Sequence, residues 1–141
     1  TNLSVGRGTD IPFRWVGAPW FRSQEVLKRM NSAKLMGMRF EIKDFTPTKS
    51  VFQGQLCRGL RMTVTDRVKA RPLEVFAHLV SAARDLHPDK FEVRWDEIRR
   101  MVGNDEFRRL YEAGVRPRAL IRMFNAGSRE FKASRFPFLL Y

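Results

Sequence analysis

The first residues whose types and spacing could recognise a ligand lie near the N-terminus. Arg7 stands between Gly6 and Gly8, and Thr9 follows. Glycine allows positive φ angles and close approach of the backbone to another group, so this stretch can present a guanidinium, a hydroxyl and amide groups to an anion or a sugar. The alternative is an ordinary turn that leads into a strand at residues 12–16. The pattern is too short for a dinucleotide-binding fingerprint, because the third glycine, the preceding apolar strand and the following helix are missing.

Three carboxylates lie in or beside expected loops, namely Asp10, Asp44 and Asp66. Glycoside hydrolysis normally needs a carboxylic acid and a second carboxylate at one bond, or a substrate group that replaces the second carboxylate. The other acidic residues mostly fall on expected helix faces, where ion pairs with neighbouring arginines account for them. These three aspartates are therefore the only carboxylates that we consider as catalytic candidates.

Metal-binding and nucleophile motifs are absent from the sequence, which contains no CxxC, HExxH or GxSxG pattern and no phosphate-binding P-loop. Cys57 is the only cysteine, so it excludes an internal disulfide, and we expect a buried structural thiol. His78 and His87 are expected on a helix surface or near a helix C-terminus. We expect no metal and no cofactor.

The composition is that of one basic domain. The 141 residues include 27 lysines and arginines against 15 acidic residues, a net charge of +12. Such a charge favours association with polyanions, either nucleic acid or the anionic polymers of a bacterial cell wall. The basic residues are spread along the chain, so a generally basic, solvated surface is the alternative. No apolar run approaches the roughly 20 residues of a membrane span. The chain begins at Thr1 without a signal-peptide pattern, which we interpret as a fragment or processed product.

Periodicity and turn residues predict an α+β fold in one compact domain. Strands are expected near Phe13, Phe40 and Met62, in a small mixed sheet covered by four or five helices. The expected strands are residues 12–16, 38–43 and 60–65, and the expected helices are residues 23–31, 72–86, 95–102, 104–113 and one from Pro117 onward. Ser23 is the expected N-cap of the first helix, and Gly127 could break the last one. The last helix should bury Leu120, Ile121, Phe124 and Phe131. The apolar residues 136–141 should dock on the core or on a neighbouring domain.

Three blocks of the sequence, in this order, resemble a known family. The segment NLSVGRGTDIPFRWVGAPW resembles the opening of the C-terminal domain of NamZ-type (YbbC-like) exo-β-N-acetylmuramidases. The similarity continues through FTPTKSVFQGQLCRGLRMTVTDR at residues 45–67 and FKASRFPFLLY at residues 131–141. It spans nearly the whole chain, so we interpret residues 1–141 as one such domain.

The resemblance implies that two domains of the intact enzyme have different roles. In these enzymes a larger, Rossmann-like N-terminal domain is expected to supply the catalytic glutamate, and the C-terminal domain to close the cleft beside it. The intact enzyme would hydrolyse terminal β-linked N-acetylmuramic acid from the non-reducing end of peptidoglycan fragments. The partners implied are the N-terminal catalytic domain and peptidoglycan fragments or N-acetylmuramic acid, and the location implied is periplasmic or exported. We expect no catalytic acid in this chain.

The resemblance also suggests which residues bind substrate. N-acetylmuramic acid carries a lactyl carboxylate, and an arginine can meet a carboxylate with two parallel hydrogen bonds. Arg7 is the first candidate for this role and Arg58 the second, although Arg58 stands where the family pattern implies a small residue. Hydroxyls, the Gly8 backbone and aromatic faces supply the remaining candidates, which are Gly8, Thr9, Thr46, Thr48, Trp20 and Trp15.

Two other functions compete with this interpretation. A basic nucleic-acid-binding module would use the +12 charge together with 12 Phe, 3 Trp and 2 Tyr. The aromatic residues, however, follow core periodicity, and no recognised nucleic-acid motif is present. The second competitor is a structural or interaction domain without a catalytic role.

Overall fold

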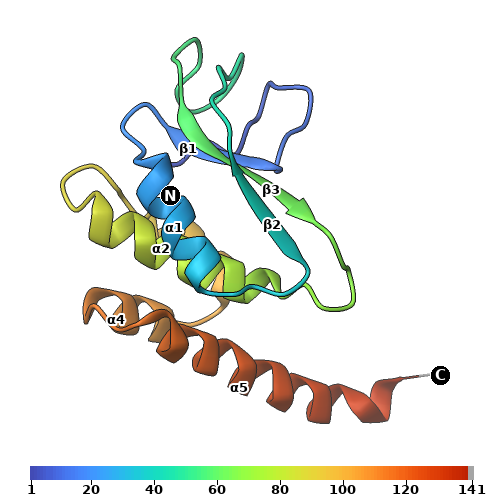
Figure 1. The fold of residues 1–141 in the computed structure, drawn as a ribbon. Coiled ribbons are helices and arrows are strands. Elements are labelled where there is room, and N and C mark those ends of the chain that lie inside the picture. The colour runs from blue at the N-terminus through green and yellow to red at the C-terminus, as the bar shows by residue number, and fades with distance from the viewer. Residues whose placement is uncertain (140–141) are drawn as a thin grey trace.

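The computed structural model describes residues 1–139, in which a three-stranded sheet packs against helices (Figure 1). The strands are β1 (Trp15–Ala18), β2 (Met38–Ile42) and β3 (Arg58–Val64). The helices are α1 (Ser23–Ser32), α2 (Pro72–Leu86), α3 (Trp95–Val102), α4 (Glu106–Glu112) and α5 (Pro117–Arg135), followed by the 3-10 turn η1 (Phe136–Phe138). The expected α+β class is confirmed.

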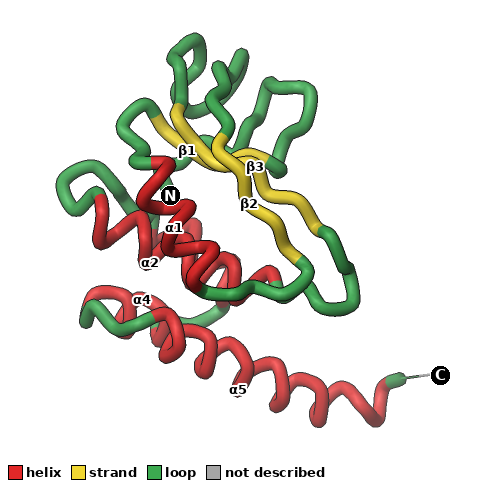
Figure 2. Tube along the Cα trace, in the orientation of Figure 1, coloured by secondary structure: helices red, strands yellow, loops and turns green. Residues whose placement is uncertain are grey.

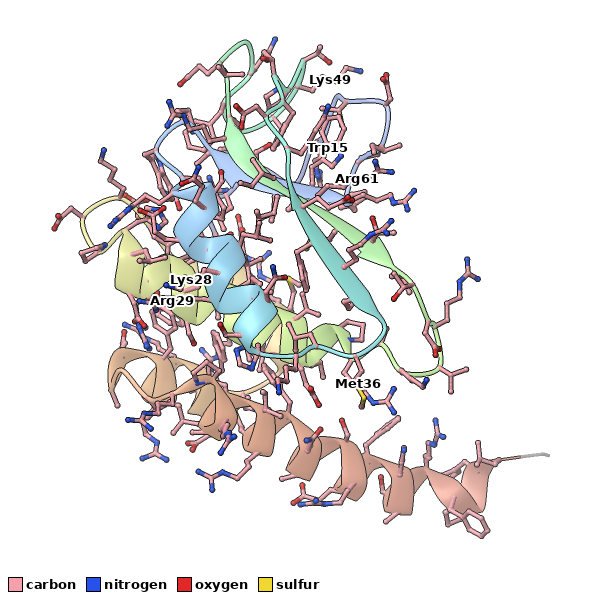
Figure 3. All side chains as sticks on the ribbon, viewed as in Figure 1. Trp15, Lys28, Arg29, Met36, Lys49 and Arg61 are labelled. Atoms are coloured by element: carbon pink, nitrogen blue, oxygen red, sulfur yellow. The ribbon has the colours of Figure 1, made fainter. Side chains whose placement is uncertain are left out.

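The sheet is built around β3, which pairs with β1 on one side and β2 on the other. Both pairs are antiparallel, where a mixed sheet was expected. Val16 is opposite Leu60, and both point to the helices. Because successive side chains alternate between faces, the neighbouring pair of Trp15 and Arg61 lies on the opposite face (Figure 3).

β1 begins at Trp15, later than the strand predicted at residues 12–16. Phe13 has a φ of +65°, which an extended strand cannot accommodate. Its amide donates a hydrogen bond to the carbonyl oxygen of Val5 at 2.7 Å, so this part of the chain closes a loop. The predicted start of the strand was therefore wrong, because the apolar alternation there belongs to a turn.

The helix boundaries follow the sequence signals. Pro72 and Pro117 occupy the first positions of α2 and α5, where the missing amide hydrogen has no cost. α3 ends at Gly103, whose φ of +80° gives the left-handed cap that glycine favours. Gly127 does not interrupt α5, so the break considered there was not found.

The core lies between the sheet and α1 and α2, and it continues to α4 and α5. α5 runs along the side of α2 that faces away from the sheet (Figure 1). The largest fully buried side chains include Phe21, Val26, Met30, Leu60, Phe107 and Leu120. Within residues 1–139, no helix is both long and apolar enough to cross a membrane.

The C-terminal half of α5 extends past this core (Figure 1). Every described residue from Gly127 onward is exposed. Phe131 was predicted to be buried but is 63% exposed, and Phe136 and Phe138 are 75% and 82% exposed. The expected docking of the C-terminal segment on the core was therefore wrong for residues 136–139, because α5 is longer than the core that it covers. Leu140 and Tyr141 lie outside the described residues.

The loops that precede β1 and connect β2 to β3 gather at one end of the sheet, as the green segments of Figure 2 show. The amide of Thr48 donates to the carbonyl oxygen of Gly8 at 3.3 Å, which joins these two loops. Most of the predicted ligand-binding residues lie on these loops or at the strand ends beside them.

Candidate functional site

The glycine loop around Arg7 is held by hydrogen bonds within and between loops. Thr9 donates its hydroxyl to the carbonyl oxygen of Gly6 at 2.6 Å, and Thr48 donates its hydroxyl to that of Gly8, also at 2.6 Å. Gly8 has a φ of +78°, and a Cβ there would lie 2.6 Å from the amide nitrogen of Lys49. Gly8 is thus required for loop packing, and both hydroxyl protons are already committed.

Three other candidate residues of these loops, Arg7, Thr46 and Asp10, are exposed. The Arg7 guanidinium lies over the Phe13 ring, 5.4 Å from its centre. Thr46 is exposed in the segment between the buried residues Phe45 and Pro47, and Asp10 is exposed in the first loop. The structure places Arg7, Gly8, Thr9 and Thr48 in one neighbourhood, and whether they bind substrate stays a prediction.

Three other predicted residues meet in a separate pocket, which we call the α1 pocket. It has a volume of about 590 Å³ and lies between the start of α1 and the ends of β2 and β3. Its lining residues are Pro19, Trp20, Phe21, Arg22, Ser23, Gln24, Glu25, Ile42, Asp44 and Arg58. The volume falls within the range of roughly 300–1,000 Å³ that is typical of small-molecule sites.

Strand register brings Trp20, Asp44 and Arg58 together. Arg58 is the first residue of β3 and stands opposite Ala18, the last residue of β1. The chain then turns through Pro19 and Trp20 into α1. Asp44 follows the end of β2, which pairs with the same end of β3. Residues that are far apart in the sequence thus converge through antiparallel pairing.

The start of α1 opens into this pocket without a side-chain cap. The N-cap position is Arg22 rather than Ser23, so the predicted cap was wrong. Ser23 is only 8% exposed, and its hydroxyl has no hydrogen-bond partner within residues 1–139. The first-turn amide of Gln24 also has no acceptor among the described residues. Unpaired amides and the helix dipole make such a helix start favourable for an anion.

His87 packs against residues 20–22, which line the α1 pocket. The sequence interpretation missed this role. Its Nε2 accepts the amide hydrogen of Arg22 at 2.9 Å, so the ring proton is on Nδ1, which donates to the carbonyl oxygen of Ala83 at 3.1 Å. The ring stacks on Phe21 at 5.5 Å and contacts Trp20 at 5.0 Å. Burial lowers the pKa of His87, which keeps the imidazole neutral near pH 7. His87 lies at the end of α2, as expected, but it is buried and neutral, so a surface or dipole role for it was wrong.

The carboxylates of the α1 pocket do not form a hydrolytic pair. The backbone amide at Glu25 and the Arg22 side chain lower the pKa of Glu25, and its carboxylate lies 2.7 Å from the Arg22 guanidinium. Glu25 is therefore ionised and unsuited to act as a general acid. The other lining carboxylate is Asp44, which is exposed.

Two of the three aspartate candidates, Asp44 and Asp66, lie far from each other. The carboxylate of Asp66 accepts the amides of Val68 at 2.9 Å and Lys69 at 3.2 Å, so it stabilises a turn. Asp44 follows one end of β2, and the Asp66 amide donates to the carbonyl oxygen of Gly37, which precedes the other end. The seven steps along the chain from Gly37 to Asp44 place the two aspartates roughly 20 Å apart. Glycosidases need two carboxyl groups roughly 5 to 10 Å apart. These two aspartates cannot act on one bond.

Cys57 is fully buried, as expected, and burial raises its pKa to about 11. It is therefore a protonated thiol at neutral pH and not an activated nucleophile. Among the residues that the structure describes, no group of three or more His, Cys, Asp or Glu side chains could hold a metal ion. The chemistry available in the α1 pocket is thus recognition by Trp20, Arg58, Asp44 and polar groups of the first turn of α1.

Known proteins are similar to this chain over its whole length. The model of the family described as exo-beta-N-acetylmuramidase NamZ, C-terminal, matches residues 1–141. The peptidoglycan beta-N-acetylmuramidase NamZ of Bacillus subtilis is 34% identical over 142 aligned residues, which cover 100% of this chain and 34% of that protein. A crystal structure of a domain-of-unknown-function protein from Bacteroides fragilis has the same fold, with a TM-score of 0.84 at 22% identity, over 99% of this chain and 38% of that chain. The chain thus spans about a third of the length of the relatives it matches.

Proposed function

The chain belongs to the family of C-terminal domains of the exo-β-N-acetylmuramidase NamZ, and on this basis we propose that it is the accessory domain of a peptidoglycan-degrading exo-β-N-acetylmuramidase. The reaction of the whole enzyme would be hydrolysis of a terminal, non-reducing N-acetylmuramic acid. Its location would be the cell wall, reached by export.

The observation that carries this proposal is the α1 pocket. Trp20 offers an aromatic face for a sugar ring, and Asp44 and the side chain of Gln24 offer hydrogen-bond partners for hydroxyl and acetamido groups. Arg58 adds a positive charge at the rim, and it forms no ion pair with any residue in 1–139. A pocket of this size and polarity suits one acidic amino sugar.

A second domain would supply the reacting carboxyl groups. Among the candidates in this chain, Asp66 is tied into a turn and lies roughly 20 Å from Asp44, at the other end of β2. The matched relatives are roughly three times longer than this chain, so they have room for a separate catalytic domain. The α1 pocket would then form one wall of a cleft whose other wall carries the catalytic groups.

The exposed end of α5 would contact the rest of that longer polypeptide. A groove of about 610 Å³, which we call the α5 groove, lies between α2, α3 and α5. Its apolar lining includes Leu73, Phe76, Met101, Met123, Phe124 and Phe131. Met101 and Phe131 are 81% and 63% exposed. An apolar surface of this kind is typical of a domain interface, and the additional length of the relatives supplies the occupant.

The test is an assay for free N-acetylmuramic acid released from a chromogenic β-N-acetylmuramide. The polypeptide that carries this domain in its full length is compared with residues 1–141 alone. Activity of the full-length polypeptide only is the expected result. Activity of residues 1–141 alone would overturn the accessory role and return attention to Asp10, Asp44 and Asp66. Absence of activity in both would contradict the proposed function.

A further inference from the structure

We propose that Arg58, together with the first turn of α1, forms a carboxylate subsite that selects acidic over neutral amino sugars. This inference rests on the proposed function for the identity of the sugar. It goes beyond that function because it assigns the selectivity to one residue, Arg58.

The charges around the α1 pocket leave Arg58 free to bind an anion. Two arginines and two carboxylates line the pocket. Arg22 and Glu25 form an ion pair at 2.7 Å and so neutralise each other. Arg58 has no such partner among the described residues, and its side chain is exposed at the start of β3. An unpaired guanidinium can offer two parallel N–H donors to a carboxylate.

The first turn of α1 supplies one further donor beside Arg58. The backbone amide of Gln24 has no acceptor within residues 1–139. The Ser23 hydroxyl is not such a donor, because it is buried on the core side of α1 with Val26 and Met30. Glu25 already places a carboxylate in the first turn, so the helix dipole adds little to the attraction for a second anion. Arg58 and Gln24 line one cavity, and the guanidinium and the free amide both favour an anion.

Asp44 opposes this attraction and therefore restricts which anions the pocket suits. It lines the same pocket, and its carboxylate repels a bound anion while it accepts hydrogen bonds from hydroxyls. A ligand that has both a carboxylate and neutral hydroxyls can satisfy Arg58 and Asp44 together. Inorganic phosphate satisfies Arg58 alone. The pocket thus suits a sugar acid better than a simple anion.

The position of His87 shows that this arrangement is held in place. The imidazole accepts the Arg22 amide and packs on Trp20 and Phe21, so the segment between β1 and α1 is fixed from behind. A rigid segment lowers the entropic cost of binding. We expect the subsite to exist before the ligand arrives.

The experiment uses the full-length polypeptide and three probes, namely N-acetylmuramic acid, N-acetylglucosamine and the carboxamide of N-acetylmuramic acid. The carboxamide keeps the shape of the lactyl group and removes its charge. Binding is measured by calorimetry, and kcat/KM is measured with the chromogenic β-glycosides of the same three sugars. Arg58→Met removes the charge at similar length, Arg58→Lys restores it, and Arg67→Met is the control at an exposed arginine at the other end of the sheet.

We expect Arg58→Met to weaken binding of N-acetylmuramic acid by about 10- to 100-fold and to change binding of the carboxamide by less than about threefold. Arg58→Lys should recover part of the loss, and Arg67→Met should have no effect. Asp44→Asn should strengthen binding of inorganic phosphate. If Arg58→Met leaves the ratio of the affinities for N-acetylmuramic acid and its carboxamide unchanged, the subsite proposal is overturned.

The two proposals fail in different ways. In one outcome, the unmodified polypeptide hydrolyses the β-N-acetylmuramide, and Arg58→Met leaves the preference for the acidic sugar unchanged. This outcome refutes the subsite alone. A polypeptide that hydrolyses nothing, yet binds N-acetylmuramic acid in an Arg58-dependent way, refutes the proposed hydrolase and retains the subsite. Equal loss of all three ligands in Arg58→Met would show a general packing role and would also overturn the subsite.

Discussion

The α1 pocket and the α5 groove have similar volumes, about 590 Å³ and 610 Å³, but opposite chemistry. The α1 pocket has unpaired donors and charged groups at a helix start, whereas the α5 groove has exposed methionine and phenylalanine side chains. Donors that lack partners favour a small polar ligand, and exposed apolar side chains favour a protein surface. The difference indicates that substrate recognition and domain contact are separated on this molecule.

The largest expected effect comes from breaking the support of the α1 pocket. His87→Ala removes a buried ring that makes two hydrogen bonds and two aromatic contacts, and it leaves the Arg22 amide without its acceptor. We expect a loss of about 2–4 kcal/mol in the free energy of unfolding, together with weaker sugar binding. Chemical denaturation and calorimetry measure these two effects.

The matched control is His78→Ala, in a partly buried histidine on the same helix α2. The free energy of unfolding should fall by less than about 1 kcal/mol in this variant, because the His78 ring makes no hydrogen bond among the described residues. Equal destabilisation by the two variants would contradict the special role of His87.

The next effect concerns Phe131, which lines the α5 groove, and the exposed Phe138 that follows α5. Replacing Phe131 and Phe138 by serine should change the stability of residues 1–141 by less than about 0.5 kcal/mol, because both side chains are already exposed. In the full-length polypeptide the same change should cost about 1–3 kcal/mol if another domain buries these rings. Thermal unfolding of both forms gives the comparison.

Two exposed apolar residues away from α5 serve as controls. Leu56 and Val68 are 61% and 82% exposed, and their replacement by serine should be neutral in both forms. If the α5 variant is as neutral as this control in the full-length polypeptide, the α5 groove is not the domain contact.

A smaller effect follows from pH. Burial lowers the pKa values of His87 and His78 below 6.5, so the unfolded chain binds protons before the folded chain does. The stability that depends on their neutral form is complete above pH 6.5 and is lost as the pH falls from 6.5 through the lowered pKa values. Denaturation between about pH 7.5 and pH 5.5 should show this loss. The slope of the free energy of unfolding against pH should decrease in His87→Gln. An unchanged slope would exclude His87 as the source of the pH dependence.

Local signals in the sequence were sufficient for the helices. Pro72 and the apolar stripe after it predicted α2, and Gly103 predicted the end of α3, because such effects depend only on residues within a few positions. The end of α5 was mispredicted for the opposite reason. Whether Phe131 is buried depends on what lies opposite it, and the periodicity of a helix carries no information about that partner.

The α1 pocket needed contacts that no local pattern encodes. Trp20 and Arg58 were each candidates, but their proximity follows from the pairing of Ala18 with Arg58 across β1 and β3. His87 was missed because its partner is the Arg22 amide, 65 positions away in the sequence. The available signal was the pair of aromatic residues at positions 20 and 21, just before α1, which need packing partners.

The smallest expected effect is that of Arg7→Ala, and it decides between the two arginine candidates. Arg7 lies over Phe13 in a loop whose threonine hydroxyls are already committed, whereas Arg58 lies in a pocket with unpaired donors. We therefore expect Arg7→Ala to change binding of N-acetylmuramic acid by less than about twofold, against the much larger loss in Arg58→Met. Calorimetry on the full-length polypeptide measures both. A tenfold loss in Arg7→Ala with an intact fold would instead place the carboxylate at the glycine loop, and it would make the α1 pocket a site for the neutral part of the sugar.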